Sequence, residues 1–274
     1  MLKYFSEARR LLQNLHHDSS VVCETPFQVL RGGIIGLPFD KGGIHPFVMM
    51  AHQILNAAPV SVQKSALWAY LEIVRPASSA EILLAQGDMH LAQNLTNFSP
   101  MQVALPWREA LGTSKSAQRK KIAVSEAKRS GWRLTLADGW SSWGPASEDK
   151  VSFEMARLES VLRSIQQHGF SPLLADSPAI GHMLVDRNHY CVVLIAGHHR
   201  AAALAALGHK SMPVIIKKII GLDGIRKWPA VRLGHTTVRE GEAVFERMIR
   251  GIPPACCECW VNESVGFKSD VVPQ

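Results

Sequence analysis

The sequence predicts an α+β fold, with a small mixed sheet and packed helices in the second half and a mostly helical first part. Residues 192–216 follow a strand, turn, helix and strand pattern. Apolar residues recur at helical spacing through much of the first part. Hydrophobic residues make up 47% of the 274 positions, so the chain can bury a full core.

Residues 1–130 are predicted to be a mostly helical N-terminal region, for which the sequence suggests no role. Apolar periodicity predicts four helices, over residues 3–15, 47–55, 61–74 and 80–91. Residues 31–46 are rich in Gly and Pro and are predicted to form turns, in which Asp40, Lys41 and His45 are the chemically notable side chains. Residues 114–130 are basic and are interpreted as a linker or an exposed helix.

Residues 131–250 are predicted to form a second domain, and residues 251–274 a cysteine-containing tail. The second domain opens with a Trp-rich passage, followed by a helix over residues 153–167. Thr237 is predicted to cap a last helix that ends at Gly251.

Residues 192–216 form the most informative unit of the second domain. The apolar strand at 192–195 and the Ala-rich helix at 200–207 are separated by Gly197, His198, His199 and Arg200, here called the GHHR box. A strand-to-helix turn offers free backbone N–H groups and the positive end of a helix dipole. The box is therefore predicted to bind an anion.

Net charge indicates the kind of partner, and the absence of membrane and secretion signals, together with the cysteine content, indicates the compartment. The formal net charge of +7 favours anionic partners such as nucleotides, phosphorylated metabolites or nucleic acid. No apolar run is long enough to span a bilayer, and the N-terminus lacks the pattern of a signal peptide, so we expect a cytoplasmic protein without a membrane partner. Five cysteines fit a reducing compartment.

Three of the cysteines, Cys256, Cys257 and Cys259, crowd into four positions of the tail. Adjacent thiols chelate one ion poorly, and no nearby histidine completes a tetrahedral set. We therefore predict no metal site among these residues.

The order of motifs from Gly144 to Lys218 resembles the ParB/sulfiredoxin superfamily. The resemblance is carried by a helix ending in Ser164-Ile165-Gln166-Gln167-His168-Gly169, by the GHHR box, and by Leu207-Gly208 followed by Met212-Pro213-Val214. It implies a ParB/Srx-like sheet with packed helices. In this superfamily the box contacts nucleotide phosphates, which implies that role for Gly197, His198, His199 and Arg200.

The branches of the superfamily differ in their match to this chain. Sulfiredoxins carry a nucleophilic Cys where this box has His198. Partitioning ParB proteins carry a helix-turn-helix module after the box domain, and the residues that follow Lys218 are too few for that architecture. Free serine kinases have a similar pair of histidines before the Arg, although they usually have Asp where this chain has Ala196. The resemblance therefore favours the kinase-like members.

The leading hypothesis is an ATP-dependent kinase of a small hydroxyl-bearing metabolite. The kinase resemblance implies a catalytic acid near the helix at 153–167, and Glu148 is favoured over Glu154 and Glu159 because it is expected in the preceding loop. His198 and His199 are the other catalytic candidates. Mg²⁺ is expected with ATP, held mainly by phosphates and water. The alternatives are a non-catalytic nucleotide- or DNA-binding regulator and, more weakly, a nuclease. The oligomeric state is left open.

Overall fold

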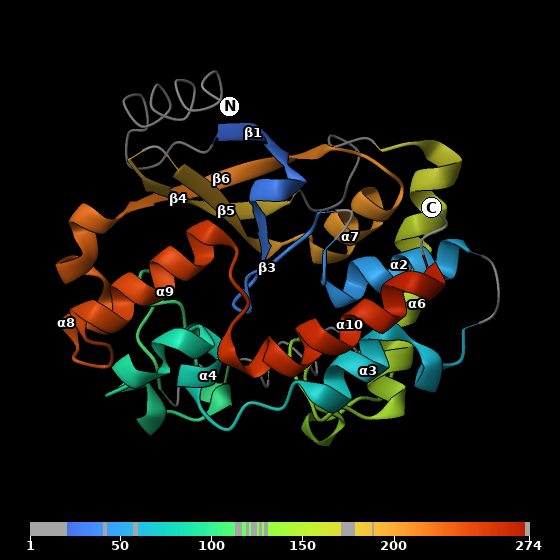
Figure 1. Ribbon diagram of the computed structural model, residues 1–274. Helices are drawn as coiled ribbons and strands as arrows, with labels where there is room; N and C mark the ends of the chain where they lie inside the picture. The colour runs from blue at the N-terminus through green and yellow to red at the C-terminus, as the bar shows by residue number, and fades with distance from the viewer. Residues whose placement is uncertain are drawn as a thin grey trace.

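A computed structural model provides the fold (Figure 1). The structure describes residues 21–40, 43–56, 60–112, 117–118, 121, 125, 128, 131–170, 179–187 and 189–271, with side chains up to residue 264. The helix predicted at 3–15 and most of the basic segment at 114–130 lie outside these residues.

Six strands form one mixed sheet. They are β1 (Val21–Pro26), β2 (Leu30–Gly32), β3 (Leu37–Pro38), β4 (Ile180–Asp186), β5 (His189–Ala196) and β6 (Ser211–Gly221). Their order across the sheet is β1-β6-β4-β5-β2-β3. The pairs β4–β6 and β2–β5 are parallel, and the other three pairs are antiparallel. The α+β fold class is confirmed.

Helices pack beside this sheet and beneath it as drawn in Figure 1. The α-helices are α2 (Pro46–Leu55), α3 (Ala66–Ile73), α4 (Ser79–Leu83), α6 (Glu148–His168), α7 (His198–Ala206), α8 (Pro229–Arg232), α9 (Val238–Arg250) and α10 (Glu258–Val271). Short 3-10 helices are η1 (Phe27–Val29), η2 (Val62–Lys64), η3 (Gln86–Leu91), η4 (Leu95–Asn97), η5 (Pro100–Gln102), η6 (Leu136–Asp138), η7 (Leu222–Lys227) and η8 (Ala255–Cys257). Among the described residues, no helix is both long and apolar enough to cross a membrane.

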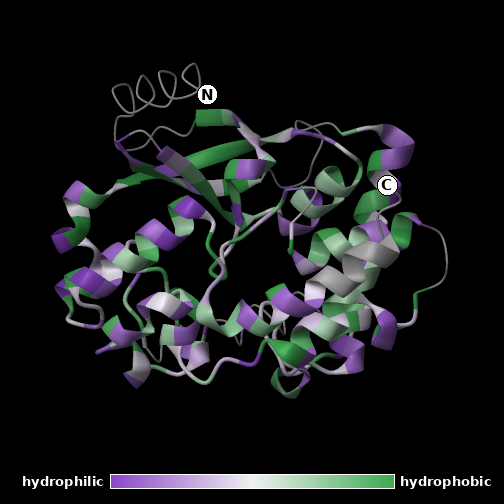
Figure 2. Cartoon of the chain, viewed as in Figure 1, coloured by the Kyte–Doolittle hydropathy of each residue, from purple (hydrophilic) through white to green (hydrophobic). Residues whose placement is uncertain are grey.

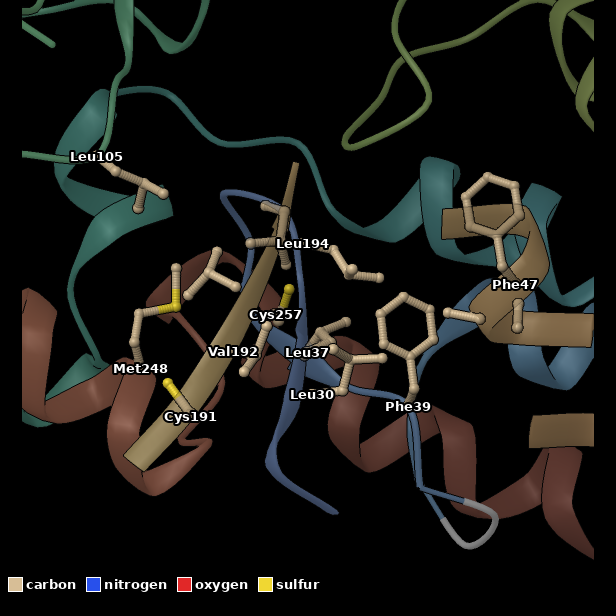
Figure 3. Close-up of a cluster of buried hydrophobic side chains, with 14 of the residues drawn as sticks. Leu30, Leu37, Phe39, Phe47, Leu105, Cys191, Val192, Leu194, Met248 and Cys257 are labelled. Carbon is tan, nitrogen blue, oxygen red and sulfur yellow. The ribbon is translucent and has the colours of Figure 1, made fainter. Parts of the chain in front are cut away.

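The sheet joins the two regions that the sequence analysis separated at residue 130. β1 lies antiparallel to β6, with Val21 opposite Ile216, and β2 lies parallel to β5, with Leu30 opposite Val192. The first region therefore contributes half of the strands, which its helical periodicity did not predict. These short strands join the sheet because doing so buries their apolar side chains. Leu30 and Leu37 are buried beside the apolar strand β5 (Figure 3).

The tail predicted at 251–274 also belongs to this structure. Its α10 packs against α2 and α3, and its η8 packs against α4 and η3. The indole N–H of the fully buried Trp260 donates to the carbonyl oxygen of Ile44 at 2.7 Å. Trp260 lies edge-on to Tyr70. The apolar contacts of this tryptophan hold the tail against the helical layer.

Helix α9 follows the predicted pattern and anchors the loop between β2 and β3. Thr237 caps it through a reciprocal capping box with Glu240, and Gly251 ends it in the left-handed conformation. Figure 2 shows hydrophobic and hydrophilic residues alternating along α9. The fully buried Arg247 of α9 donates to the carbonyl oxygens of Leu83 at 2.7 Å and Ile35 at 2.8 Å.

Candidate functional site

The GHHR box lies at the start of α7, as predicted. Gly197 has φ 98° and ψ 16°, a left-handed conformation that suits glycine, and His198 is the first helical residue. A Cβ on Gly197 would also approach the Cβ of Ala179 to 2.9 Å. Both constraints favour glycine at the turn that exposes the first N–H groups of α7.

The box opens into a cavity of about 930 Å³. This volume is within the range of small-molecule and cofactor sites. The cavity is bounded by the end of β5, the β2–β3 loop, the first turn of α2 and one face of α6. The side chains of its wall that carry charge, an imidazole or an indole are His45, Arg108, Glu109, Trp132, Trp140, Lys150, Glu154, Arg157, His182, His198, His199 and Arg200.

Glu154 is the central carboxylate of this cavity. It is 2% exposed, and its oxygens lie 2.6 Å from Lys150 Nζ and 2.9 Å from His199 Nε2. Burial alone would raise the pKa of Glu154, but the contact with His199 and the charge of Lys150 outweigh burial and lower it to about 2. Glu154 is therefore ionised at neutral pH and holds His199 against α6.

The α-helical repeat places these groups on one face of α6. Lys150, Glu154 and Arg157 are spaced by four and three residues, so their side chains adjoin, and Arg157 Nη1 lies 3.6 Å from Glu154. Ser147 starts the helix by accepting a hydrogen bond from the backbone N–H of Lys150. This cap sets the first turn of α6 immediately after Ser147.

The favoured acid of the sequence analysis, Glu148, lies elsewhere. It is exposed in the first turn of α6, rather than in the preceding loop, because Ser147 caps the helix before it. Neither Glu148 nor Glu159, which pairs with Arg163 at 2.6 Å, is among the residues that line the cavity. The carboxylate that the fold brings to the box is Glu154.

The two histidines of the box occupy different environments. His199 is 17% exposed, contacts Glu154 and lies edge-on to Phe47. His198 is turned toward Phe39, and burial, together with the nearby His199, lowers its pKa to about 4. Arg200 completes the box at the cavity wall, and burial lowers its pKa from the ordinary value.

A third histidine, His45, reaches the same place from the Gly/Pro-rich segment. Its ring stacks on Phe39 at 4.0 Å, and burial, with His198 and His199 nearby, lowers its pKa to about 3. The backbone of this segment also approaches the box, because a Cβ on Gly33 would lie 3.1 Å from His198 Nε2. The sequence marked His45 as notable but gave no sign that it would meet the box; Lys41 lies outside the described residues.

The lowered pKa values of His45 and His198 predict a loss of stability in mild acid. When folding lowers a histidine pKa, the unfolded chain takes up the proton first as the pH falls. The stability contributed by neutral His45 and His198 is complete above about pH 6.5 and is lost as the pH falls through their folded pKa values. The unfolding free energy should therefore fall from about pH 7 to about pH 4, by up to about 1.4 kcal/mol per pH unit for each group.

The variant His45→Phe tests this linkage, since phenylalanine retains an aromatic ring beside Phe39 but cannot take up a proton. Urea unfolding across that pH range should give a shallower fall for the variant than for the wild type. Identical slopes for the two proteins would contradict a neutral, buried His45.

The described residues offer no preformed metal site. They contain no group of three or more His, Cys, Asp or Glu side chains arranged to hold a metal ion. Cys256, Cys257 and Cys259 are among these described residues and form no such group. Glu154 already contacts Lys150 and His199. Magnesium bound with a nucleotide would accordingly take most of its ligands from phosphates and water.

Comparisons with known proteins add no relative to this description. No family model matches the chain, and neither a curated protein nor a solved structure matches it at a significant level. The functional interpretation therefore depends on the site itself.

Proposed function

We propose that this chain is a cytoplasmic, nucleotide-dependent phosphotransferase of the ParB/sulfiredoxin type, which transfers a phosphoryl group from ATP to a small hydroxyl-bearing metabolite. The observation that carries the proposal is the position of the GHHR box. It begins a helix at the wall of a cavity of about 930 Å³, and one of its histidines is held by a buried carboxylate.

The charge of the cavity wall supports an anionic ligand. The wall carries four cationic side chains and two carboxylates, so positive charge is in excess. His45 and His198 stay neutral at neutral pH. The cations are Arg108, Lys150, Arg157 and Arg200, and the carboxylates are Glu109 and Glu154. Arg200 and the free N–H groups at the start of α7 are the candidate phosphate ligands, since a guanidinium binds phosphate through two parallel hydrogen bonds.

His199 is the candidate proton acceptor. Its Nε2 faces the ionised Glu154, which orients the ring and stabilises it when it becomes positive. Nδ1 is then the nitrogen available to take the proton of an acceptor hydroxyl. The bound nucleotide supplies the phosphoryl group, and the chain aligns the reactants and neutralises their charge.

Replacing Arg200 with alanine tests the phosphate-binding role. ATP affinity should fall about 10-fold to 100-fold, since a charge-assisted hydrogen bond contributes about 1.5–3 kcal/mol. The measurements are calorimetric titration with ATP and Mg²⁺ and release of ADP in the presence of pooled hydroxylated metabolites. Arg163→Ala is the matched control, because Arg163 is exposed on α6 and pairs with Glu159.

Equal ADP release by the wild type and Arg200→Ala would exclude this mechanism. If the protein binds ATP but releases no ADP with any of the acceptor metabolites, the result would favour the alternative, a non-catalytic nucleotide-binding regulator. DNA binding that weakens steeply with salt would favour the nucleic-acid version of that alternative.

A further inference from the structure

The tryptophans of this protein fall into two groups by environment. Four of the seven are buried in the core: Trp107, Trp143, Trp228 and Trp260. The other three, Trp68, Trp132 and Trp140, are partly exposed. Trp132 and Trp140 line the cavity that the GHHR box opens into. Exposed indole surface at a cavity wall is unfavourable in water and is available to a planar ligand.

Trp132 belongs to a small hydrophobic cluster separate from the main core. This cluster contains Leu134 and Phe153. The rings of Trp132 and Phe153 meet at 64°, with centroids 5.7 Å apart. Because this contact is edge-to-face and no other ring contact of Trp132 is found among the described residues, the indole has no stacked partner within that part of the chain.

A continuous series of contacts runs from Trp132 to the box. Phe153 lies against Trp132, Lys150 Nζ lies 5.0 Å from the centre of the Phe153 ring, and the same Nζ contacts Glu154 at 2.6 Å. Glu154 in turn contacts His199. The aromatic surface and the anion-binding turn therefore lie along one face of α6, and a ligand with a charged end and a planar end matches both.

We propose that Trp132 stacks on the purine or pyrimidine ring of the bound nucleotide, an inference that rests on the phosphate-binding role proposed above for the GHHR box. Arg157 lies 5.2 Å from the centre of the Phe153 ring and adds a cation beside the same surface. Stacking recognises the flat face that all nucleobases share. The site thus selects nucleotides over phosphorylated sugars of similar charge.

Two ligands distinguish the contribution of the base to binding from that of the phosphates. ATP carries both, whereas inorganic tripolyphosphate carries only the phosphate chain. Calorimetric titrations of the full chain should show ATP affinity about 10-fold or more weaker in Trp132→Leu than in the wild type, the usual size of one base–aromatic stack. Tripolyphosphate affinity should be unchanged. Trp132→Phe should retain part of the ATP affinity, and Trp68→Leu, outside the cavity wall, should retain all of it.

The outcomes distinguish this inference from the proposed function. Equal ATP affinity in Trp132→Leu and the wild type would overturn the stacking role and leave the phosphate site intact. Equal weakening of both ligands would also overturn it, because Trp132 would then support the site as a whole. Failure of the wild type to bind either ligand would overturn the proposed function and the stacking role together.

Discussion

Replacing Arg247 with methionine is expected to destabilise the folded chain by about 3 kcal/mol, because buried carbonyl groups would lose their donors. The guanidinium is 1% exposed and bonds to the carbonyl oxygens of Leu83 and Ile35, with longer bonds to those of Ile34 and Ile252. Methionine keeps the apolar stem but supplies no N–H group. Urea unfolding monitored by circular dichroism measures the difference.

Arg250→Ala, on the same helix, is the control for that measurement. Arg250 is 68% exposed and lies 3.8 Å from Glu246, so its removal should change the unfolding free energy by less than about 0.5 kcal/mol. Ile34 and Ile35 also line the cavity. Under the proposed function, Arg247→Met should therefore weaken ATP binding as well. A variant as stable as the wild type would show that the bonds from α9 do not hold this loop.

Replacing Glu154 with glutamine is expected to have a comparably large effect. The change removes the carboxylate charge and leaves the Lys150 ammonium, 5% exposed and 2.6 Å from Glu154, without its counter-ion. Removing one member of a buried ion pair costs about 3–5 kcal/mol. If the chain has the proposed phosphotransferase activity, that activity should fall by about 10²-fold or more, because His199 would lose the carboxylate proposed to orient it for proton transfer.

A double-mutant cycle separates the buried pair from its neighbours. Lys150→Met should be destabilising alone, whereas Lys150→Met combined with Glu154→Gln should recover much of the stability lost in either single variant. Glu159→Gln, on the exposed side of α6, is the control. If the two single effects simply add, the pair is not coupled and Glu154 is not the anchor of this site.

The sequence predicted best those features that depend on neighbouring residues. The strand, glycine turn, helix and strand at 192–216 were correct, because β-branched residues, Gly197 and an alanine run act locally. The capped helix ending at Gly251 was correct for the same reason.

The candidate acid shows where local patterns fail. Glu154 looks like an ordinary charged residue of an amphipathic helix, and its burial is set by α7 and by the His199 that α7 positions. Apolar periodicity places the start of this helix after Glu148, whereas the Ser147 cap brings Glu148 into its first turn. The approach of His45 to the box depends equally on contacts between distant segments, which periodicity does not encode.

The pairing of β1 with β6 has a consequence for the order in which the chain can fold during synthesis. The first strand finds its partner only after Ser211–Gly221 has been made, and β2 waits for β5. Until then, β1 has no partner among the described strands and β2 has only β3, so their remaining backbone groups are open to association with other chains. Efficient production of this protein should therefore depend on protecting the nascent chain until its second half emerges from the ribosome.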